Sequence, residues 1–318
     1  MTVPADDQPL VLLAAADDTY ALPLAVTLFS ALEQLTTGCK VKVYIADGGI
    51  SLSNRAHIER VVRRPKVDLH LVWLEPSLHD LQTLPPGSGE VAYISQATYL
   101  RLFAPDFISE AKAIYLDSDL LVQHSLEDLW RTDLTFHAAA AVPERSTATL
   151  GEALPQIDSQ THPLVAAAPY YNAGMLLIDL DKWRADDVAA ATFAVIREYR
   201  EVIRYLDQDG LNIVLQGRWF RLEARWNFQV NSTILRTEPL PLEDVFILHY
   251  STRFKPWLKL AFGLERPYYN RYLKVLKRSG WFSPLGYIAF YLRLALGSAS
   301  ERTAQLSRRV LLRRSHKR

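Results

Sequence analysis

Apolar runs and helical patterns alternate over the first third of the chain. The apolar runs predict short buried strands, and apolar residues repeating every three or four positions predict the helices between them. In order, these segments are Leu10–Ala16 (strand), Tyr20–Leu35 (helix), Lys40–Ala46 (strand), Ser53–Arg63 (helix) and Val67–Trp73 (strand). Strand, helix, strand, helix, strand is typical of a parallel sheet with crossover helices, so the pattern predicts an α/β fold.

The remainder continues the same alternation with longer irregular stretches. Segments 75–90 and 143–169 lack a regular pattern, and we expect the first to be a loop and the second a lid. Strands are predicted at Ala113–Val122, Phe136–Val142, Tyr170–Asp181 and Phe246–Tyr250, and helices at Gln96–Phe103, Asp187–Tyr205 and Asp209–Leu215. The polar motifs stand where apolar runs end, which is where open α/β sheets bind their ligands.

The run Ala113–Val122 carries two carboxylates, Asp117 and Asp119. We expect one buried strand, on which residues two apart point to the same face. Two like charges side by side are costly to bury unless a cation compensates them, so the pair indicates a divalent metal site. The alternative is a surface turn, which Asp-Ser-Asp also suits. Aliphatic residues directly before and after the pair favour the strand.

Composition describes an ordinary globular protein with an uneven distribution of charge. Of 318 residues, 49% are hydrophobic and 22% charged, and the net charge is +1. From Tyr268 onward there are 12 Lys/Arg and one acid, a net of +11, which leaves 24 basic and 34 acidic residues before it, a net of −10. Because this tail mixes bases with aromatic residues and leucines, we expect it to associate with an anionic membrane surface. Nucleic-acid binding fits the acidic body badly, and a solvated tail needs no aromatic residues.

The cysteine content and the N-terminal sequence indicate the cellular location that we expect. Cys39 is the only cysteine, so no internal disulfide can form, as suits a reducing compartment. Residues 1–10 contain two aspartates and no basic residue, so we expect no secretory signal. No apolar run reaches the roughly 18 residues of a transmembrane helix. We therefore expect a cytoplasmic protein, peripheral on the inner face of a membrane.

Six sequence blocks resemble, in order, the retaining GT-A glycosyltransferases of family 8, the group of glycogenin and the bacterial lipooligosaccharide galactosyltransferases. They are Ala15-Ala16-Asp17-Asp18-Thr19-Tyr20, Thr98-Tyr99-Leu100-Arg101-Leu102, Tyr115-Leu116-Asp117-Ser118-Asp119, Tyr171-Asn172-Ala173-Gly174-Met175-Leu176-Leu177-Ile178, Asp207-Gln208-Asp209-Gly210-Leu211-Asn212, and His249-Tyr250 with Lys255-Pro256-Trp257. The resemblance implies a GT-A domain over residues 1–267, with a mainly parallel, Rossmann-like sheet and flanking helices. A basic amphipathic extension would follow over residues 268–318.

The resemblance also implies an activity. It is that of a retaining hexosyltransferase that moves glucose or galactose from UDP-glucose or UDP-galactose to a carbohydrate or glycolipid acceptor, as in lipopolysaccharide biosynthesis. Two alternatives stay open. One is a glycogenin-like protein that glucosylates a tyrosine of its own partner subunit, and the other is a nucleotide-sugar binding protein without catalysis.

The resemblance implies a metal site made of Asp117, Asp119 and His249, where a divalent cation bridges the donor's two phosphates. Two carboxylates and an imidazole suit Mn²⁺ better than Mg²⁺, which prefers all-oxygen shells, so Mg²⁺ is expected as a weaker substitute. The ammonium of Lys255 would supplement the cation at the diphosphate.

The remaining roles follow from the resemblance as well. Asp207 would bind sugar hydroxyls, and Gln208 would lie near the anomeric carbon, on the face opposite the nucleotide. Thr19 stands where the family often has Asn, and Thr252 where it usually has Gly. Uracil and ribose contacts are expected from Asp17, Thr19 and Tyr20, and Arg101 is expected near the sugar and diphosphate. Further donor-binding residues are expected at Ala15, Ser118, Asn172 and Gly174.

Overall fold

Seven strands form a central sheet in the order β3-β2-β1-β4-β7-β6-β8, and three more form a small sheet in the order β5-β10-β9. The computed structural model describes residues 8–76, 84–86, 95–157 and 166–298. The strands are β1 (Leu10–Ala16), β2 (Lys40–Asp47), β3 (Asp68–Leu74), β4 (Lys112–Leu116), β5 (Leu120–Val122), β6 (Ala139–Ala141), β7 (Met175–Asp179), β8 (Trp219–Arg221), β9 (Phe228–Gln229) and β10 (Ile247–His249). In the central sheet only β7 runs antiparallel to its neighbours, so the predicted mainly parallel α/β fold is confirmed.

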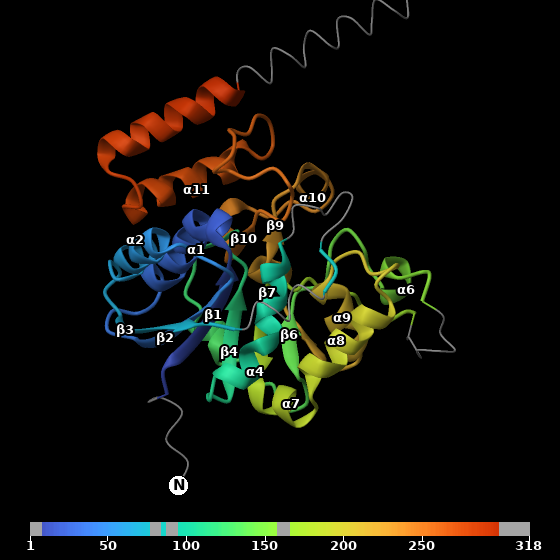
Figure 1. Ribbon diagram of the computed structural model, residues 1–318. Coiled ribbons are helices and arrows are strands. Elements are labelled where there is room, and N and C mark those ends of the chain that lie inside the picture. Colours follow the sequence, from blue (N-terminus) through green and yellow to red (C-terminus); the bar gives the residue numbers. More distant parts are fainter. Residues whose placement is uncertain (1–7, 77–83, 87–94, 158–165, 299–318) are drawn as a thin grey trace, which may run out of the picture.

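Helices cover both faces of the central sheet (Figure 1). One face carries α1 (Ala21–Glu33), α2 (Leu52–Val62) and α11 (Arg266–Ser279). The other carries η3 (Gln96–Phe103), α4 (Ala104–Phe107), α7 (Leu180–Ala185), α8 (Val188–Glu198) and α9 (Asp207–Val214). Shorter elements are η1 (Asp18–Tyr20), α5 (Glu127–Trp130), α6 (Leu150–Ala153), η4 (Ala224–Trp226), α10 (Ser232–Thr237) and η5 (Leu242–Asp244).

Strand β1 explains why the first apolar run is unbroken. Leu10, Leu12 and Ala14 point into the core beneath α1, and Val11 and Leu13 point into the core on the opposite face. A strand buried on both faces needs apolar residues at every position, as parallel sheets require. The predicted bounds of this strand are confirmed residue for residue, and α1, β2, α2 and β3 lie within two residues of prediction at most of their ends.

The expectation of one continuous strand over Ala113–Val122 is wrong. Strand β4 ends at Leu116 in the central sheet, and β5 begins at Leu120 in the small sheet, with Asp117-Ser118-Asp119 as a turn between them. The physical reason is a buried hydroxyl on α1. Thr27 Oγ1 lies 2.8 Å from the Leu120 carbonyl oxygen and 3.0 Å from that of Ser118, and it accepts from the Leu120 N–H. These contacts provide hydrogen-bond partners for the buried backbone groups at the point where the chain passes from the central sheet to the small sheet.

Other predicted elements are shorter than expected. Of Phe136–Val142 only β6 is a strand, and Phe136 is exposed. Tyr170–Asp181 is reduced to β7, the helix expected over Asp187–Tyr205 ends at Glu198, and Gln96–Phe103 is a 3₁₀ helix. The stretch expected to be a lid contains α6 and two isolated bridges, while residues 158–165 lie outside the described residues, as does most of the loop expected over 75–90.

The start of the basic tail packs into the body. Helix α11 buries Tyr268, Tyr269, Tyr272, Leu273 and Leu276 in the same core as α1. Residues 284–298 form a further helix beside it, seen in red at the top of Figure 1. The division expected at residue 267 therefore falls inside α11. Within the described residues, the longest apolar helical stretches are too short or too polar to cross a bilayer.

Candidate active site

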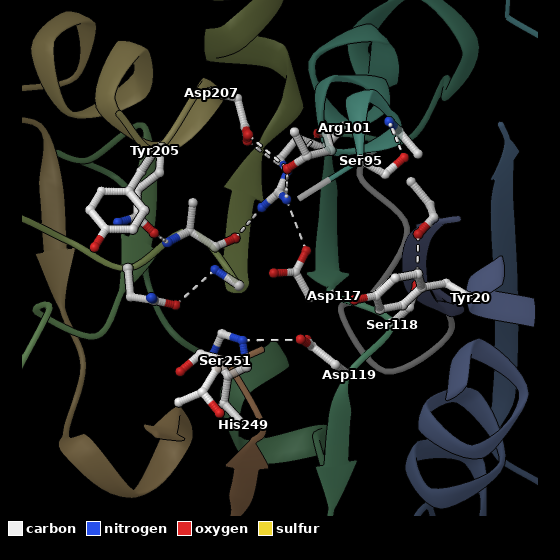
Figure 2. Close-up of a pocket in the computed structure, with 18 of the residues that line it drawn as sticks. Tyr20, Ser95, Arg101, Asp117, Ser118, Asp119, Tyr205, Asp207, His249 and Ser251 are labelled. Atoms are coloured by element: carbon white, nitrogen blue, oxygen red, sulfur yellow. Dashed lines mark hydrogen bonds and ion pairs between the residues drawn. The ribbon is translucent and has the colours of Figure 1, made fainter. Parts of the chain in front are cut away.

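A cleft of about 380 Å³ opens where β1 and β4 end, beside the small sheet and the start of α9 (Figure 2). Thirteen of the fourteen residues predicted for the site line it. Thr19 does not line the cleft and is exposed on η1, so its ribose contact stays a prediction. The others present are Ala15, Asp17, Tyr20, Arg101, Asp117, Ser118, Asp119, Asn172, Gly174, Asp207, Gln208, His249 and Lys255.

Asp117, Asp119 and His249 converge, with one ligand atom of each within 4.8 Å of the others. The turn after β4 supplies the two carboxylates, and the antiparallel pairing of β10 with β5 places His249 opposite Leu120. Asp119 Oδ1 is buried without a hydrogen-bond donor and lies 3.3 Å from His249 Nε2. A buried carboxylate oxygen without a donor, facing an imidazole nitrogen, fits a divalent cation between them. The three residues predicted as metal ligands therefore form a candidate metal site.

The second oxygen of Asp119 is already paired. Lys255, which is 2% exposed, places its Nζ 2.6 Å from Asp119 Oδ2 and 2.6 Å from the carbonyl oxygen of Tyr250. Burial by itself raises the pKa of Asp119, but Lys255 and His249 outweigh it and hold that pKa well below its ordinary value. Asp119 is therefore ionised, as a metal ligand must be.

Arg101 joins Asp117 of the candidate metal site to Asp207, one of the two residues predicted to face the sugar. Its guanidinium lies 2.8 Å from Asp117 Oδ1 and 2.8 Å from Asp207 Oδ2, and it also donates to Thr98 and to the carbonyl of Ala173. Burial alone lowers the pKa of Arg101, but the two carboxylates outweigh it and raise that pKa. From an isolated helical pattern Arg101 reads as an exposed arginine, whereas here it is a buried positioning residue that orients two carboxylates.

Asp207 and Gln208 stand at the first turn of α9. Thr98 Oγ1 donates to Asp207 at 2.7 Å, and burial, opposed by Arg101, raises the pKa of Asp207 to about 6. Gln208 Oε1 accepts from the Ala173 N–H at 3.0 Å, and its Nε2 donates to the Tyr170 hydroxyl at 3.0 Å. The Gln208 amide is thus held at both ends, with its orientation fixed before any ligand binds.

Asn172 directly precedes a turn at Ala173 and Gly174 that leads into β7. A Cβ at Gly174 would overlap the His249 ring, so glycine is needed there because the imidazole packs directly on the backbone. Asn172 Oδ1 accepts from the Gly174 N–H at 2.9 Å and from Asn227 Nδ2 at 2.8 Å.

At the other end of the cleft, Asp17 and Tyr20 follow β1. Asp17 Oδ1 accepts from the backbone N–H groups of Thr19 and Tyr20 at 3.0 and 3.2 Å, so this carboxylate caps η1. The Ser118 hydroxyl donates to the Ala15 carbonyl at 2.7 Å, which ties the Asp-Ser-Asp turn to the end of β1. These contacts fix the backbone at the end of the cleft where nucleotide contacts are predicted.

The structure adds residues that sequence reasoning missed. Thr98 lies within one of the six blocks, but no role was predicted for it. The other residues lie in stretches of sequence that gave no functional signal. Their contribution becomes visible only through contacts between distant segments. They are Thr27, Thr98, Glu144, Tyr170, Asn227 and Gln229.

Comparisons with known proteins agree with this geometry. The family model described as glycosyl transferase family 8 matches residues 11–261. The galactosyltransferase LgtC, solved in complex with donor and acceptor sugar analogues, superimposes with a TM-score of 0.70 at 27% identity, covering 88% of this chain and all of that one. A putative glycosyltransferase of Haemophilus influenzae is 28% identical over 90% of this chain and 86% of its own length. General stress protein A of Bacillus subtilis is 26% identical over 86% of this chain and 96% of its own.

The sheet order, the cleft and these matches define a glycosyltransferase of GT-A fold. The chain belongs to glycosyl transferase family 8, as its six blocks predicted.

Proposed function

We propose that the protein transfers a hexose, galactose or glucose, from a UDP-sugar to an acceptor hydroxyl with retention of anomeric configuration. The observation that carries this proposal is the junction made by Arg101, which fixes Asp117 of the metal cluster and Asp207 of the sugar pair on one guanidinium. A sugar donor would lie across Arg101, with its diphosphate near Asp117 and its hexose near Asp207. The similarity to LgtC, a galactosyltransferase, supports a hexose donor.

Charge in the cleft suits a diphosphate that binds together with a cation. The cleft lining holds five carboxylates and three cationic side chains, a net of −2; the acids are Asp17, Asp117, Asp119, Glu144 and Asp207, and the bases are Arg101, Arg253 and Lys255. Mn²⁺, or more weakly Mg²⁺, held by Asp117, Asp119 and His249 would neutralise the departing diphosphate. The uracil and ribose would then reach the end of β1, where Ala15, Asp17 and Tyr20 line the cleft.

We favour a mechanism in which the acceptor hydroxyl attacks the anomeric carbon on the same face from which the diphosphate leaves. The properties of Gln208 and Asp207 favour it over a covalent intermediate. The neutral Gln208 amide is a poor nucleophile, and the Asp207 carboxylate is held by Thr98 and Arg101, which suits it to bind sugar hydroxyls. The leaving diphosphate would then take the proton of the acceptor hydroxyl on the same face. The fixed Gln208 amide would stabilise the oxocarbenium-like charge from the other face.

The test is a hydrolysis and transfer screen across UDP-sugars with Mn²⁺. We expect activity with UDP-galactose or UDP-glucose, loss of it in EDTA and recovery with Mn²⁺ above Mg²⁺. NMR of the product's anomeric proton should show an α-linkage from the α-linked donor, and a β-linkage would overturn retention. Full activity in chelator would overturn the metal site. A mass increase of the intact protein in hexose steps would instead indicate self-glucosylation.

We also propose that the protein binds an anionic membrane, with a glycolipid of lipopolysaccharide type as acceptor. Nine of the twelve large exposed apolar side chains in the described residues belong to the C-terminal apolar surface, which consists of Phe254, Leu258, Phe262, Leu264, Leu285, Ile288, Tyr291, Leu292 and Leu296. The N–H of Leu260 donates to Ser298 Oγ at 2.9 Å, which joins the two segments. An extended apolar surface of this kind marks an interaction site.

The arrangement within the helix 284–298 supports a lipid surface. Leu294 is buried, Tyr287 and Phe290 pack against the protein core, and Leu285, Ile288, Leu292 and Leu296 follow one another at helical spacing on the exposed side. Between residues 253 and 298 there are nine basic residues and one acid, so the surface lies in a positive segment. Apolar groups among bases are what anionic lipid attracts.

Sedimentation with anionic liposomes tests this surface. Replacing Leu292 and Leu296 with Glu should abolish binding while leaving hydrolysis of the donor unchanged, and binding of the unmodified chain should weaken with salt. Leu52→Glu is the matched control, because Leu52 is 82% exposed on α2 and outside this surface. Equal sedimentation of all three proteins would overturn the assignment of the surface.

A further inference from the structure

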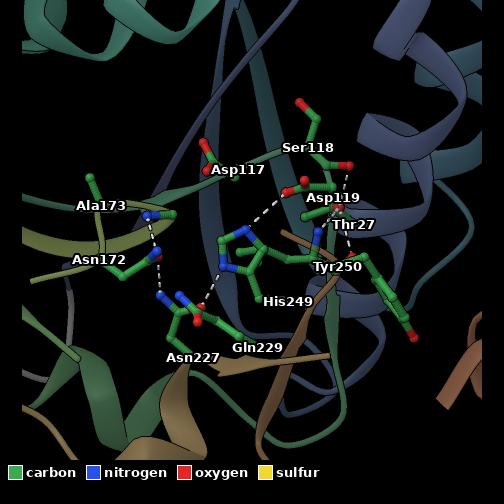
Figure 3. A network of polar contacts seen from close by, with 12 residues as sticks. Thr27, Asp117, Ser118, Asp119, Asn172, Ala173, Asn227, Gln229, His249 and Tyr250 are labelled. Carbon is green, nitrogen blue, oxygen red and sulfur yellow. Dashed lines mark hydrogen bonds and ion pairs between the residues drawn. The ribbon is translucent and has the colours of Figure 1, made fainter. Parts of the chain in front are cut away.

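Asn227 is a buried residue that touches the candidate metal site without belonging to it. It is 1% exposed and directly precedes β9, whose parallel pairing with β10 sets Gln229 opposite His249. Its Oδ1 lies 2.8 Å from His249 Nδ1, and its Nδ2 donates to Asn172 Oδ1 at 2.8 Å (Figure 3). A chain of polar contacts therefore runs from Asn172 through Asn227 to the imidazole.

The direction of this chain is fixed at its Asn172 end. The Gly174 N–H can only donate, so the atom of Asn172 that it meets at 2.9 Å is the amide oxygen. The other amide atom of Asn172 lies 2.8 Å from Glu144 Oε2, a carboxylate oxygen that also receives Gln229 Nε2 at 2.8 Å. A nitrogen that donates and an oxygen that accepts are the only assignment of Asn172 that satisfies both neighbours.

That assignment propagates to His249. Because Asn172 presents an oxygen, Asn227 must turn its nitrogen toward Asn172 and its oxygen toward the imidazole. An amide oxygen only accepts, so His249 Nδ1 must carry a proton. In the neutral imidazole the lone pair is then on Nε2, the atom that faces Asp119 Oδ1 at 3.3 Å. A metal ligand requires this lone pair.

We infer that Asn227 is a positioning residue that holds His249 as the Nδ1–H tautomer and thereby makes Nε2 available to the metal. The inference rests on the proposed metal site. It adds Asn227 to that site and gives the reason why His249 Nε2 can bind a metal. Glu144 and the Gly174 N–H act one step further out, because they determine which way Asn172 points. Partners of this kind typically change metal affinity by about 10- to 100-fold.

The tautomer is measured directly in the metal-free protein. The chain has eight histidines, so ¹⁵N-histidine labelling gives a tractable spectrum, and His249→Gln identifies the signal of this residue. At alkaline pH, where the imidazole is neutral, we expect the proton on Nδ1 and a bare Nε2. A proton on Nε2 would overturn the inference whatever the activity of the enzyme.

Two matched truncations separate positioning from stability. Asn212 is also a buried asparagine, 2% exposed, with hydrogen bonds to the backbone of Tyr171 and Gln208. Asn227→Ser and Asn212→Ser should both lower the unfolding temperature. Only Asn227→Ser should weaken Mn²⁺ binding, by about 10- to 100-fold in electron paramagnetic resonance titrations with UDP present, and allow the Nε2–H tautomer.

The outcomes distinguish this inference from the proposed function. If the unmodified protein binds no Mn²⁺, the metal site is wrong, and the spectrum of the metal-free protein still decides the tautomer. If Asn227→Ser keeps both the Nδ1–H tautomer and Mn²⁺ affinity within twofold, Asn227 does not position His249. If Asn227→Ser fails to fold, the tautomer of the unmodified protein decides the question alone.

Discussion

At the scale of single residues, two buried basic side chains form ion pairs with three carboxylates of the cleft. Arg101 holds Asp117 and Asp207, and Lys255 holds Asp119. Each ion pair fixes a side chain that the proposed reaction needs, and each costs desolvation that only these close contacts offset. Most of the residues that line the cleft at its charged centre were predictable from the six blocks because their types are characteristic. Their partners were not, because Asn227 and Glu144 act through contacts made across 55 and 28 residues of chain.

The stability of Asp207→Asn relative to the unmodified chain should rise as the pH rises from about 4 to about 6. Burial raises the pKa of Asp207 to about 6 from an ordinary value of 3.8, so the folded state holds a proton that the unfolded state releases. The carboxylate therefore costs stability in full above about pH 6, by at most about 3 kcal/mol, and costs nothing below the unfolded pKa.

Thermal melts of both proteins from pH 4 to 8 measure this difference. The gain in unfolding temperature of Asp207→Asn over the unmodified chain should grow as pH rises from 4 to 6 and then stay constant. A difference that does not change with pH would show that Asp207 titrates normally. Thr98→Ser, which keeps the hydroxyl that donates to Asp207, serves as the control with an unchanged pH profile.

Gln208→Ala should slow transfer without abolishing it. If Gln208 contributes only a fixed amide dipole, its loss should lower kcat by about 10²- to 10³-fold, on the scale of one oxyanion-hole donor. Rates with UDP-galactose and UDP-glucose check this. Complete inactivity with normal UDP binding, or a trapped glycosyl adduct on Gln208, would instead indicate a covalent intermediate and leave retention standing.

At the scale of elements, the central event is the break between β4 and β5. Apolar patterning predicted a strand there because residues on both sides of the two carboxylates are buried. It could not predict that they are buried in different sheets, since the hydroxyls that stabilise the break come from α1, about 90 residues earlier. Thr27 and Ser30 are both buried on that helix, and Ser30 Oγ accepts from the Val122 N–H at 3.0 Å. By contrast, β1 was predicted completely because it is buried on both faces.

Thr27→Val should therefore loosen the metal site. Valine keeps the shape of threonine but leaves the Leu120 N–H without its acceptor, which should cost about 1–3 kcal/mol of stability. Because the same contact holds the Asp-Ser-Asp turn, Mn²⁺ affinity should fall as well. Urea unfolding and calorimetry with Mn²⁺ and UDP measure the two effects. Thr27→Ser retains the hydroxyl and should show neither loss in Mn²⁺ affinity nor a weaker turn.

At the scale of the whole molecule, the boundary predicted at residue 267 from the charge asymmetry cuts through α11, which packs into the same core as α1. The aromatic residues that indicated membrane contact fall into two groups. Those of α11 pack inward, with Tyr272 set edge-on against Tyr250, the residue after His249. Of the later ones, Trp281, Phe282, Tyr287 and Phe290 also pack against this core, whereas Tyr291 is exposed on the helix 284–298. Sequence composition could not separate them, because both groups share the same mixture of bases and aromatic rings.

Two truncations test this division of the tail. A chain ending at Glu265 loses α11 and with it five large buried side chains, each worth about 1.5–3 kcal/mol when fully buried. Their sum is comparable to the entire stability of a typical domain, about 5–15 kcal/mol, so this chain should not unfold cooperatively or bind UDP. A chain ending at Ser298 keeps α11 and the helix 284–298, and should melt and hydrolyse donor like the full chain. Circular dichroism melts and UDP calorimetry compare the three proteins. A cooperative melt of the shorter chain near that of the full-length protein would show that residues 266–298 are a separate appendage, because the Tyr250–Tyr272 contact beneath His249 would then contribute nothing to the fold of the site.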